Sequence, residues 1–138
     1  MTSDSKRFFG ALDQVTAARE WVGDRLREAA VSAREIDAIQ LAVSEAAANV
    51  MRHAYEGKYP AAFDLDLSID EDRISLLLRD EGRPFAPDGV AAPDPEALAE
   101  SGYGLFLIES IMDEVTYTPG ATGTVLRLSK RRGGSDAP

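Results

Sequence analysis

In residues 63–69, apolar side chains occupy every second position, and aspartate or serine fills the positions between them. This period of two predicts a β-strand with one face on a core and the other face in water. A polar turn over residues 70–73 leads into residues 74–79, which are mostly apolar and predict a second, more fully buried strand. The two segments therefore predict a hairpin in a sheet with one solvent-facing side.

Two helical patterns precede this hairpin. Residues 13–30 carry an apolar stripe, with Asp13 as the expected N-cap. Residues 32–54 begin with a capping-box sequence, in which the Ser32 oxygen accepts the backbone amide of Glu35 and the Glu35 side chain reaches back. Each helix presents one apolar face and is expected to pack on the core.

The order of the elements predicts the fold class. The other expected elements are a short strand or lead-in at 7–12, a loop at 81–101 with one short helix near 94–99, a third helix at 105–112, and a closing hairpin at 114–118 and 123–129. Strands joined by short turns, with about three helices gathered on one face, predict an α+β two-layer sandwich with a mostly antiparallel sheet. One domain is expected at 1–132, followed by a disordered tail at 133–138.

The composition narrows the class of protein. A chain of 138 residues, 44% of them hydrophobic, suits one domain that buries roughly two thirds of its unfolded surface. The chain has no cysteine, which excludes disulfides, thiolate zinc sites and thiol nucleophiles. It also lacks an apolar run near the roughly 20 residues of a membrane span and an apolar N-terminal signal, so we expect a cytoplasmic protein without membrane contact.

The net charge restricts the partners. A charge of −9 and a pI of about 4.6 argue against direct binding to nucleic acid. An acidic protein that binds a nucleotide needs local help from a divalent cation and from backbone N–H groups.

Three polar residues share one stripe of the second helix. Glu45, Asn49 and His53 are spaced four residues apart, beside the apolar face. The Asn49 amide oxygen is a suitable ligand for Mg²⁺ that phosphates and water otherwise coordinate. Glu45 could take a proton from an attacking hydroxyl or water. The alternative is a polar seam on an amphipathic helix, with His53 as a helix-end group favoured by the dipole.

A second motif ends the strand predicted at 74–79. The Asp80 carboxylate could accept a hydrogen bond from an exocyclic amine such as adenine N6, and Gly82 would let the backbone approach a flat ring. Thr124, on the last strand, could assist Asp80. The alternatives are an ordinary turn with Asp80 as its cap, and a threonine chosen for β-propensity.

A third motif joins the long loop to the third helix. Gly102 and Gly104 flank Tyr103 and precede Leu105, where free N–H groups and the positive helix end can bind an anion. A flexible hinge is the alternative for a lone pair of glycines.

Taken together, these residues resemble the GHKL superfamily of ATP-binding domains, whose fold is an α/β sandwich with a movable lid. The helix with Glu45 and Asn49 is similar to the N-box, residues 80–82 to the first glycine box, and residues 102–104 to the second. Within the superfamily, residues 8–130 most resemble the bacterial anti-sigma-factor serine/threonine kinases of partner-switching systems. The segments that carry this likeness are 41–49, 52–55, 80–82, 104–108, 112–115 and 123–124.

The resemblance implies a role for each residue. Asn49 would hold Mg²⁺ that bridges the phosphates of ATP or ADP, and Glu45 would be the general base. Asp80 would read adenine, helped by Gly82 and Thr124. The other residues implied to bind the nucleotide are Arg52, His53, Gly102, Tyr103, Gly104 and Leu105.

The resemblance also implies partners. Members of the family phosphorylate a serine or threonine of a small anti-anti-sigma protein and alternatively sequester a sigma factor. They often form homodimers. Arg19, on the first helix, stands where the family places an arginine for partner contact.

Two features depart from the family pattern. Pro84 stands where the first glycine box often has a second glycine, and it is expected to stiffen the hinge of the lid. The lid, residues 86–101, is short and acidic and offers no Lys or Arg to the γ-phosphate. Charge stabilisation would then come from Mg²⁺, backbone amides, and Arg52 or Arg83.

Three other functions are open on the sequence alone. One is a non-catalytic, nucleotide-binding anti-sigma module. The second is a histidine-kinase catalytic domain; against it, the sequence shows no upstream helical hairpin that carries a phosphoacceptor histidine. An ATPase of the gyrase, mismatch-repair or heat-shock-chaperone kind would need further domains.

Overall fold

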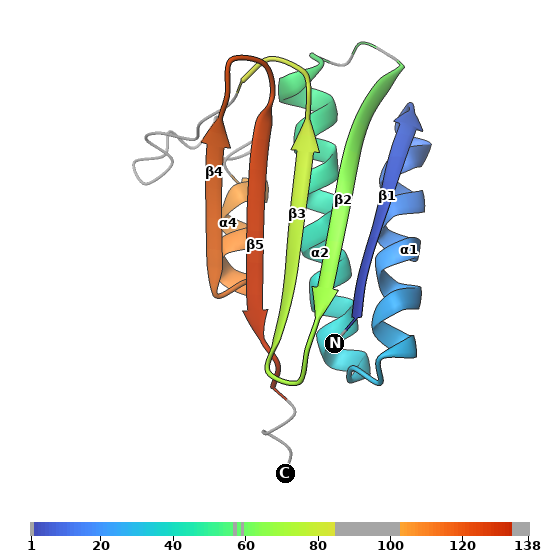
Figure 1. Cartoon of the computed structure of the whole chain (residues 1–138). Coiled ribbons are helices and arrows are strands. Elements are labelled where there is room, and N and C mark those ends of the chain that lie inside the picture. Colours follow the sequence, from blue (N-terminus) through green and yellow to red (C-terminus); the bar gives the residue numbers. More distant parts are fainter. Residues whose placement is uncertain (1, 57, 59, 85–102, 134–138) are drawn as a thin grey trace.

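The computed structural model describes residues 2–56, 58, 60–84 and 103–133 (Figure 1). Five strands form one sheet in the order β1-β2-β3-β5-β4, and every neighbouring pair runs antiparallel. The strands are β1 (Thr2–Gly10), β2 (Ala61–Ile69), β3 (Arg73–Asp80), β4 (Glu114–Pro119) and β5 (Thr124–Arg131).

The helices cover one face of this sheet (Figure 1). They are α1 (Asp13–Glu28), α2 (Ala33–Asn49) and α4 (Tyr103–Ile111), and α2 continues into a π-helical turn, η1 (Val50–Ala54). Helix α2 lies between α1 and α4 and contacts both of them. The predicted α+β two-layer sandwich with a mostly antiparallel sheet is confirmed.

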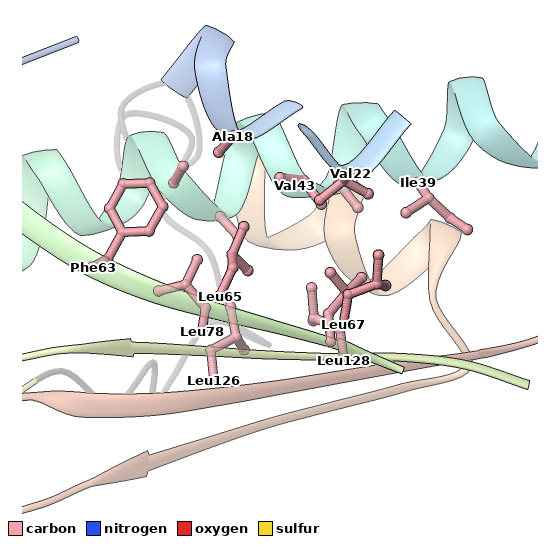
Figure 2. Close-up of a cluster of buried hydrophobic side chains, with 14 of the residues drawn as sticks. Ala18, Val22, Ile39, Val43, Phe63, Leu65, Leu67, Leu78, Leu126 and Leu128 are labelled. Carbon is pink, nitrogen blue, oxygen red and sulfur yellow. The ribbon is translucent and has the colours of Figure 1, made fainter. Parts of the chain in front are cut away.

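The core lies between the two layers (Figure 2). In β2 the buried and half-exposed positions alternate along the whole strand, so the prediction from the period of two is confirmed. Strand β3 alternates in the same way, and its outward side chains are only half buried. The buried side chains that meet in the core include Ala18, Val22, Ile39 and Val43 from the helices, and Phe63, Leu65, Leu67, Leu78, Leu126 and Leu128 from the sheet.

The first strand differs from the prediction of 7–12. Strand β1 begins at Thr2 and pairs with β2 along its full length, up to the pair of Gly10 with Ala61. Its first residues are polar and show no alternation, so only the pairing with β2 defines them as a strand. Phe8 anchors the strand in the core, where its ring stacks on Phe63 with 5.3 Å between the centroids.

The helix starts were predicted with mixed success. Asp13 is not the N-cap of α1: it is the first helical residue, and the preceding Leu12 makes no side-chain capping bond. At that position the Asp13 charge still faces the positive end of the helix. In α2 the expected cap is present, because the Ser32 hydroxyl oxygen accepts the Glu35 amide at 3.2 Å.

The Glu35 side chain completes the capping box differently. Its carboxylate accepts a hydrogen bond from the Ser32 hydroxyl at 3.3 Å and another from the Gly133 amide at 2.5 Å. The second bond joins Gly133 to α2. Residues 134–138 lie outside the described part of the chain.

Within the described residues, the helices are too short or too polar to cross a membrane.

Candidate functional site

A small cavity lies between the end of α2 and strands β3, β4 and β5. Four residues predicted to form a site, Asn49, His53, Asp80 and Thr124, line it together. Its volume is about 20 Å³, room for roughly one water molecule and far less than a purine ring needs. The other lining residues are Ala46, Val50, Ala54, Leu78, Tyr117 and Leu126.

Asn49 ends α2 and is buried in the cavity wall, with 5% of its surface exposed. Its Oδ1 atom accepts a hydrogen bond of 2.7 Å from Nη2 of Arg52, an exposed side chain one turn further on. Its Nδ2 atom is buried and makes no well-formed hydrogen bond within the described part of the chain. A buried amide donor is costly to leave unsatisfied, so Nδ2 is suited to an acceptor oxygen on a neighbouring element.

The helix changes its winding directly after Asn49. The Tyr55 amide donates to the Val50 carbonyl at 3.3 Å, five residues back, which defines the π-helical turn η1. His53 lies in this turn and lines the cavity. Burial lowers the pKa of His53, and the charges of Arg52 and Arg83 lower it further, so the imidazole is held neutral.

Asp80 ends β3 and is held by two backbone amides. Its Oδ1 atom accepts the Gly82 amide at 3.0 Å, and the carboxylate also accepts the amide of Thr124. Burial raises the pKa of Asp80 above its ordinary value. The hydrogen bonds from the two backbone amides partly oppose this shift, and the charge of Glu81 adds to it. The two hydrogen bonds therefore fix the orientation of the carboxylate, and burial leaves it poorly solvated. Both properties suit an acceptor that binds one amine group.

The glycines around Asp80 permit close backbone packing. A Cβ atom on Gly82 would overlap the carbonyl of Ala54 in η1, and the neighbouring Arg83 amide donates to that carbonyl at 2.7 Å. Gly123 has a φ of +79°, and a Cβ there would overlap the Asp80 carbonyl. The sequence pointed to Gly82 for approach to a ring; in the structure Gly82 first allows approach to the helix end.

Gly123 is a site residue that the sequence analysis missed. Its amide donates to the Gly82 carbonyl at 2.8 Å, and it places Thr124 against Asp80. The signal that could have found it is its place directly before Thr124, the only residue of that pair to which the sequence analysis gives a role.

Tyr117, in β4, was also missed. It lines the cavity, its hydroxyl is buried, and it interacts with the Asn49 side chain. Burial raises the pKa of Tyr117 far above its usual range, with a contribution from the charge of Glu109, while the interaction with Asn49 lowers it. The alternation of β4, in which Val115 and Tyr117 face the same side, was the signal that could have found it.

The remaining predicted residues have different surroundings. Glu45 lies one turn before Asn49, is half buried, and is not one of the described residues that line the cavity. Leu105 is buried, and Tyr103 and Gly104 belong to the first turn of α4, which begins earlier than predicted. Gly102 and the lid residues 86–101 lie outside the described part of the chain.

The two arginines considered for charge stabilisation are both engaged. Arg52 binds Asn49, whereas Arg83 forms an ion pair with Glu56 over 2.8 Å. Arg19, the expected partner contact, lies half-exposed on α1, and its carbonyl accepts a hydrogen bond from the Gln40 side chain at 3.0 Å.

The donor groups fit a magnesium ion that phosphates mainly hold. The described residues contain no group of three or more His, Asp or Glu side chains placed to enclose a metal. Asn49 supplies one neutral oxygen, which already binds a cation in the form of the Arg52 guanidinium. A site with one protein oxygen suits Mg²⁺, which keeps several waters and binds substrate phosphates.

Comparison with known proteins gives a family match over most of the chain. Residues 9–130 match the family model described as "Histidine kinase-like ATPase domain". The serine-protein kinase RsbW of Oceanobacillus iheyensis is 33% identical over 132 residues, which cover 85% of this chain and 83% of that relative. The RsbW of Bacillus subtilis is 35% identical, over 74% of this chain and 73% of its own length.

Solved structures share the fold. The RsbU and RsbW domains of Rv1364c from Mycobacterium tuberculosis match with a TM-score of 0.71 and 17% identity, over 95% of this chain and 32% of that longer chain. The structure of the SiaB–SiaC complex from Pseudomonas aeruginosa matches with a TM-score of 0.62 and 13% identity, over 91% of this chain and 89% of that one. The chain therefore belongs to the histidine kinase-like ATPase family, within its group of RsbW-type serine-protein kinases.

Proposed function

We propose that this protein is an ATP-dependent serine/threonine protein kinase that phosphorylates a small anti-anti-sigma protein and, in its other state, sequesters a sigma factor. The observation that supports this best is the meeting of Asn49, Asp80 and Thr124 at one cavity between the layers. These residues come from three separate segments of the chain. They supply, within one site, an acceptor for an amine and an oxygen ligand for a cation.

Asp80 would recognise adenine through its exocyclic amine. The carboxylate keeps the direction that the amides of Gly82 and Thr124 give it, and it is poorly solvated. Because the cavity is far smaller than a purine, we infer that only the amine edge of adenine enters it, to reach Asp80, and that the ring lies outside the cavity. Guanine carries a carbonyl oxygen in place of that amine, so a carboxylate here favours adenine.

The phosphate end would lie along α2, on the Asn49 side. Bound Mg²⁺ would supply charge neutralisation of the phosphates. Asn49 would offer its Oδ1 atom to the metal, and Arg52, which now holds that oxygen, would then be free to contact a phosphate. Glu45 lies four residues before Asn49, which is about 6 Å along the helix axis.

Glu45 would act as the general base in the transfer step. Its carboxylate takes the proton of the partner's serine or threonine hydroxyl while that oxygen forms a bond to the γ-phosphorus. The bond from the γ-phosphorus to the bridging oxygen breaks, and ADP leaves with the electron pair. Most of the acceleration comes from position and charge stabilisation, since phosphoryl transfer needs little covalent help from the protein.

A binding module without transfer is the second candidate. Two observations favour it: Asn49 is occupied by Arg52, and Glu45 stands apart from the cavity that the described residues form. In that case the nucleotide would only set the affinity for the sigma factor.

The protein partners follow from the family. The relatives are named serine-protein kinases, and the SiaB structure was solved with a second protein. By analogy we assign this chain a protein substrate, a competing sigma factor, a cytoplasmic location and a homodimeric state, with Arg19 as a partner contact.

Substitution of Glu45 separates the two candidates. For Glu45→Gln we expect Mg·ATP affinity within about twofold of the parent and transfer lowered by at least about 100-fold, the scale of a lost general base. The measurement is phosphoserine or phosphothreonine formation, by mass spectrometry, on a candidate anti-anti-sigma protein incubated with Mg·ATP. Unchanged transfer by Glu45→Gln contradicts the base assignment, and no transfer by the parent chain favours the binding module.

A further inference from the structure

Tyr117 reaches the Asn49 side chain from the opposite layer of the fold. In the β4–β5 pair, Tyr117 stands opposite Leu126, whose side chain is buried beneath the helices. Paired residues of an antiparallel ladder point to the same face, so the Tyr117 ring also points inward. Its buried hydroxyl interacts with Asn49 in the cavity.

The two ends of the Asn49 carboxamide are in different surroundings. The oxygen, Oδ1, binds the Arg52 guanidinium at 2.7 Å. The nitrogen, Nδ2, is buried and makes no well-formed hydrogen bond with the described residues, and the Tyr117 hydroxyl interacts with this side chain. Half a turn about the last bond of asparagine exchanges oxygen for nitrogen, and only one of the two orientations offers an acceptor to a cation.

We propose that Tyr117 is a positioning residue for Asn49: its hydroxyl oxygen accepts an amide hydrogen of Nδ2 and so directs Oδ1 toward the cation. This inference rests on the proposed role of Asn49 as a magnesium ligand. In this structure, the cation at Oδ1 is the Arg52 guanidinium. In the nucleotide complex Mg²⁺ would take its place, while Tyr117 stays on the opposite end of the amide.

The chemistry gives this contact a consequence for metal affinity. If Asn49 turned over, its two N–H donors would face the cation, and the repulsion would remove the ligand. Loss of a residue that hydrogen-bonds a metal-ligating side chain commonly lowers metal affinity on the order of 10- to 100-fold, because that residue fixes the orientation of the ligand. A tyrosine hydroxyl suits this task since it can accept one hydrogen bond while its ring is locked in the core.

The test is the Mg²⁺ dependence of ADP binding in Tyr117→Phe. This change removes one oxygen and keeps the ring. We expect the Mg²⁺ concentration for half-maximal enhancement of ADP binding to rise on the order of 10-fold. Affinity for ADP in EDTA should stay within about twofold, because the base contacts of Asp80 are untouched. Titration calorimetry with and without Mg²⁺ measures both quantities.

Two further variants make the result specific. In a background of Asn49→Ala, Tyr117→Phe should have no further effect on Mg²⁺ dependence, since no amide remains to be oriented. Tyr55→Phe is the matched control: the Tyr55 hydroxyl also lies near the site, but it bonds the Ala62 carbonyl at 2.6 Å and the Glu81 amide at 3.1 Å. Its loss should change ADP affinity by the same factor with and without Mg²⁺.

The outcomes separate this inference from the proposed function. If Asn49→Ala abolishes the Mg²⁺ effect and Tyr117→Phe leaves it unchanged, Tyr117 has no positioning role and the proposed function stands. If Tyr117→Phe acts equally in the Asn49→Ala background, its effect is merely structural and the inference is wrong. If Asn49→Ala itself retains the full Mg²⁺ effect, the metal role fails and this inference fails with it.

A spectroscopic measurement covers the case in which Tyr117→Phe unfolds. In the parent protein with Mg·ADP, the side-chain amide protons of Asn49 should exchange slowly with water, which NMR measures. Rapid exchange of those protons in the complex would show that nothing holds the amide, and would overturn the inference.

Discussion

At the scale of single residues, Asp80 shows how burial and hydrogen bonding oppose each other in the site. Two backbone amides hold its carboxylate, yet burial dominates and the pKa is raised. Asp66, on the open face of the sheet, behaves in the opposite way, because hydrogen bonds from Arg79 and Ser5 lower its pKa. A buried carboxylate that is costly to ionise lowers the stability of the fold, and such groups are typical of ligand-binding sites.

We therefore expect Asp80→Asn to lower ADP affinity on the order of 10- to 100-fold without lowering stability at neutral pH. In the parent the folded state holds the Asp80 proton more tightly than the unfolded chain does. Stability therefore falls as pH rises from the ordinary pKa of 3.8 through the raised value, and this loss persists above it. The variant lacks this loss, so its advantage in the free energy of unfolding should grow as pH increases from about 4.

Urea unfolding at a series of pH values measures this difference, and calorimetry measures the affinity. Asp64→Asn is a suitable control, since that carboxylate pairs with Arg7 on the solvent-facing side of the sheet at 3.0 Å. An exposed pair of this kind contributes at most about 1 kcal/mol. A gain in stability for Asp80→Asn that is independent of pH would contradict the argument.

At the scale of elements, the site depends on three segments that touch through their backbones. The turn after β3 bonds the last turn of the helix through the Arg83 amide and the Ala54 carbonyl, and it bonds the β4–β5 turn through Gly82 and Gly123. The π-helical turn η1 lies in this junction, and such turns often mark functional sites. The helix end and the turn after β3 therefore cannot move independently without breaking these hydrogen bonds.

Glycine substitutions test this junction. Gly82→Ala and Gly123→Ala each add a methyl group that overlaps a backbone carbonyl, so we expect a loss of about 1–3 kcal/mol in the free energy of unfolding, and more at Gly123 because of its positive φ. Gly120→Ala, in the same β4–β5 turn, has its nearest atom at 3.5 Å and should stay within about 0.5 kcal/mol. Chemical denaturation of the three variants gives the comparison, and equal losses at all three positions would rule out the proposed crowding.

At the scale of the whole molecule, the site joins the two layers of the sandwich. Its groups come from α2 in one layer and from β3, β4 and β5 in the other. A ligand that bridges them stabilises the folded state by mass action. The described helices cover one face of the sheet, and the cavity lies between the end of α2 and that face (Figure 1).

We expect Mg·ATP at about 100 times its dissociation constant to raise the melting temperature by about 5–10 °C, which corresponds to about 2.7 kcal/mol. ATP with EDTA should give a smaller shift, because the phosphates then lack their cation. In Asn49→Ala the two shifts should become equal. Differential scanning fluorimetry measures all four conditions, and GTP serves as the control nucleotide. An equal response to GTP would contradict the role of Asp80.

Much of the fold could be predicted because it depends on local patterns. The alternation in β2 fixes which side chains face the core, and Ser32 fixes the start of α2. The convergence of Asn49, Asp80 and Thr124 also followed from their motifs, since each stands at a strand or helix end that the fold brings to one cavity. In contrast, β1 was misjudged, because its first residues form a strand only through pairing with β2.

The sequence by itself determined the layers, the order of helices and hairpins, and the polar residues available to bind a nucleotide. These depend on periodicity and on residue type, which are written into neighbouring positions. Only the tertiary structure decided that Arg52 caps the Asn49 oxygen, that Tyr117 meets the same amide from β4, and that Gly123 packs on Asp80. Such contacts depend on strand register and on distances of a few ångströms between segments far apart in the chain, and no local pattern encodes them.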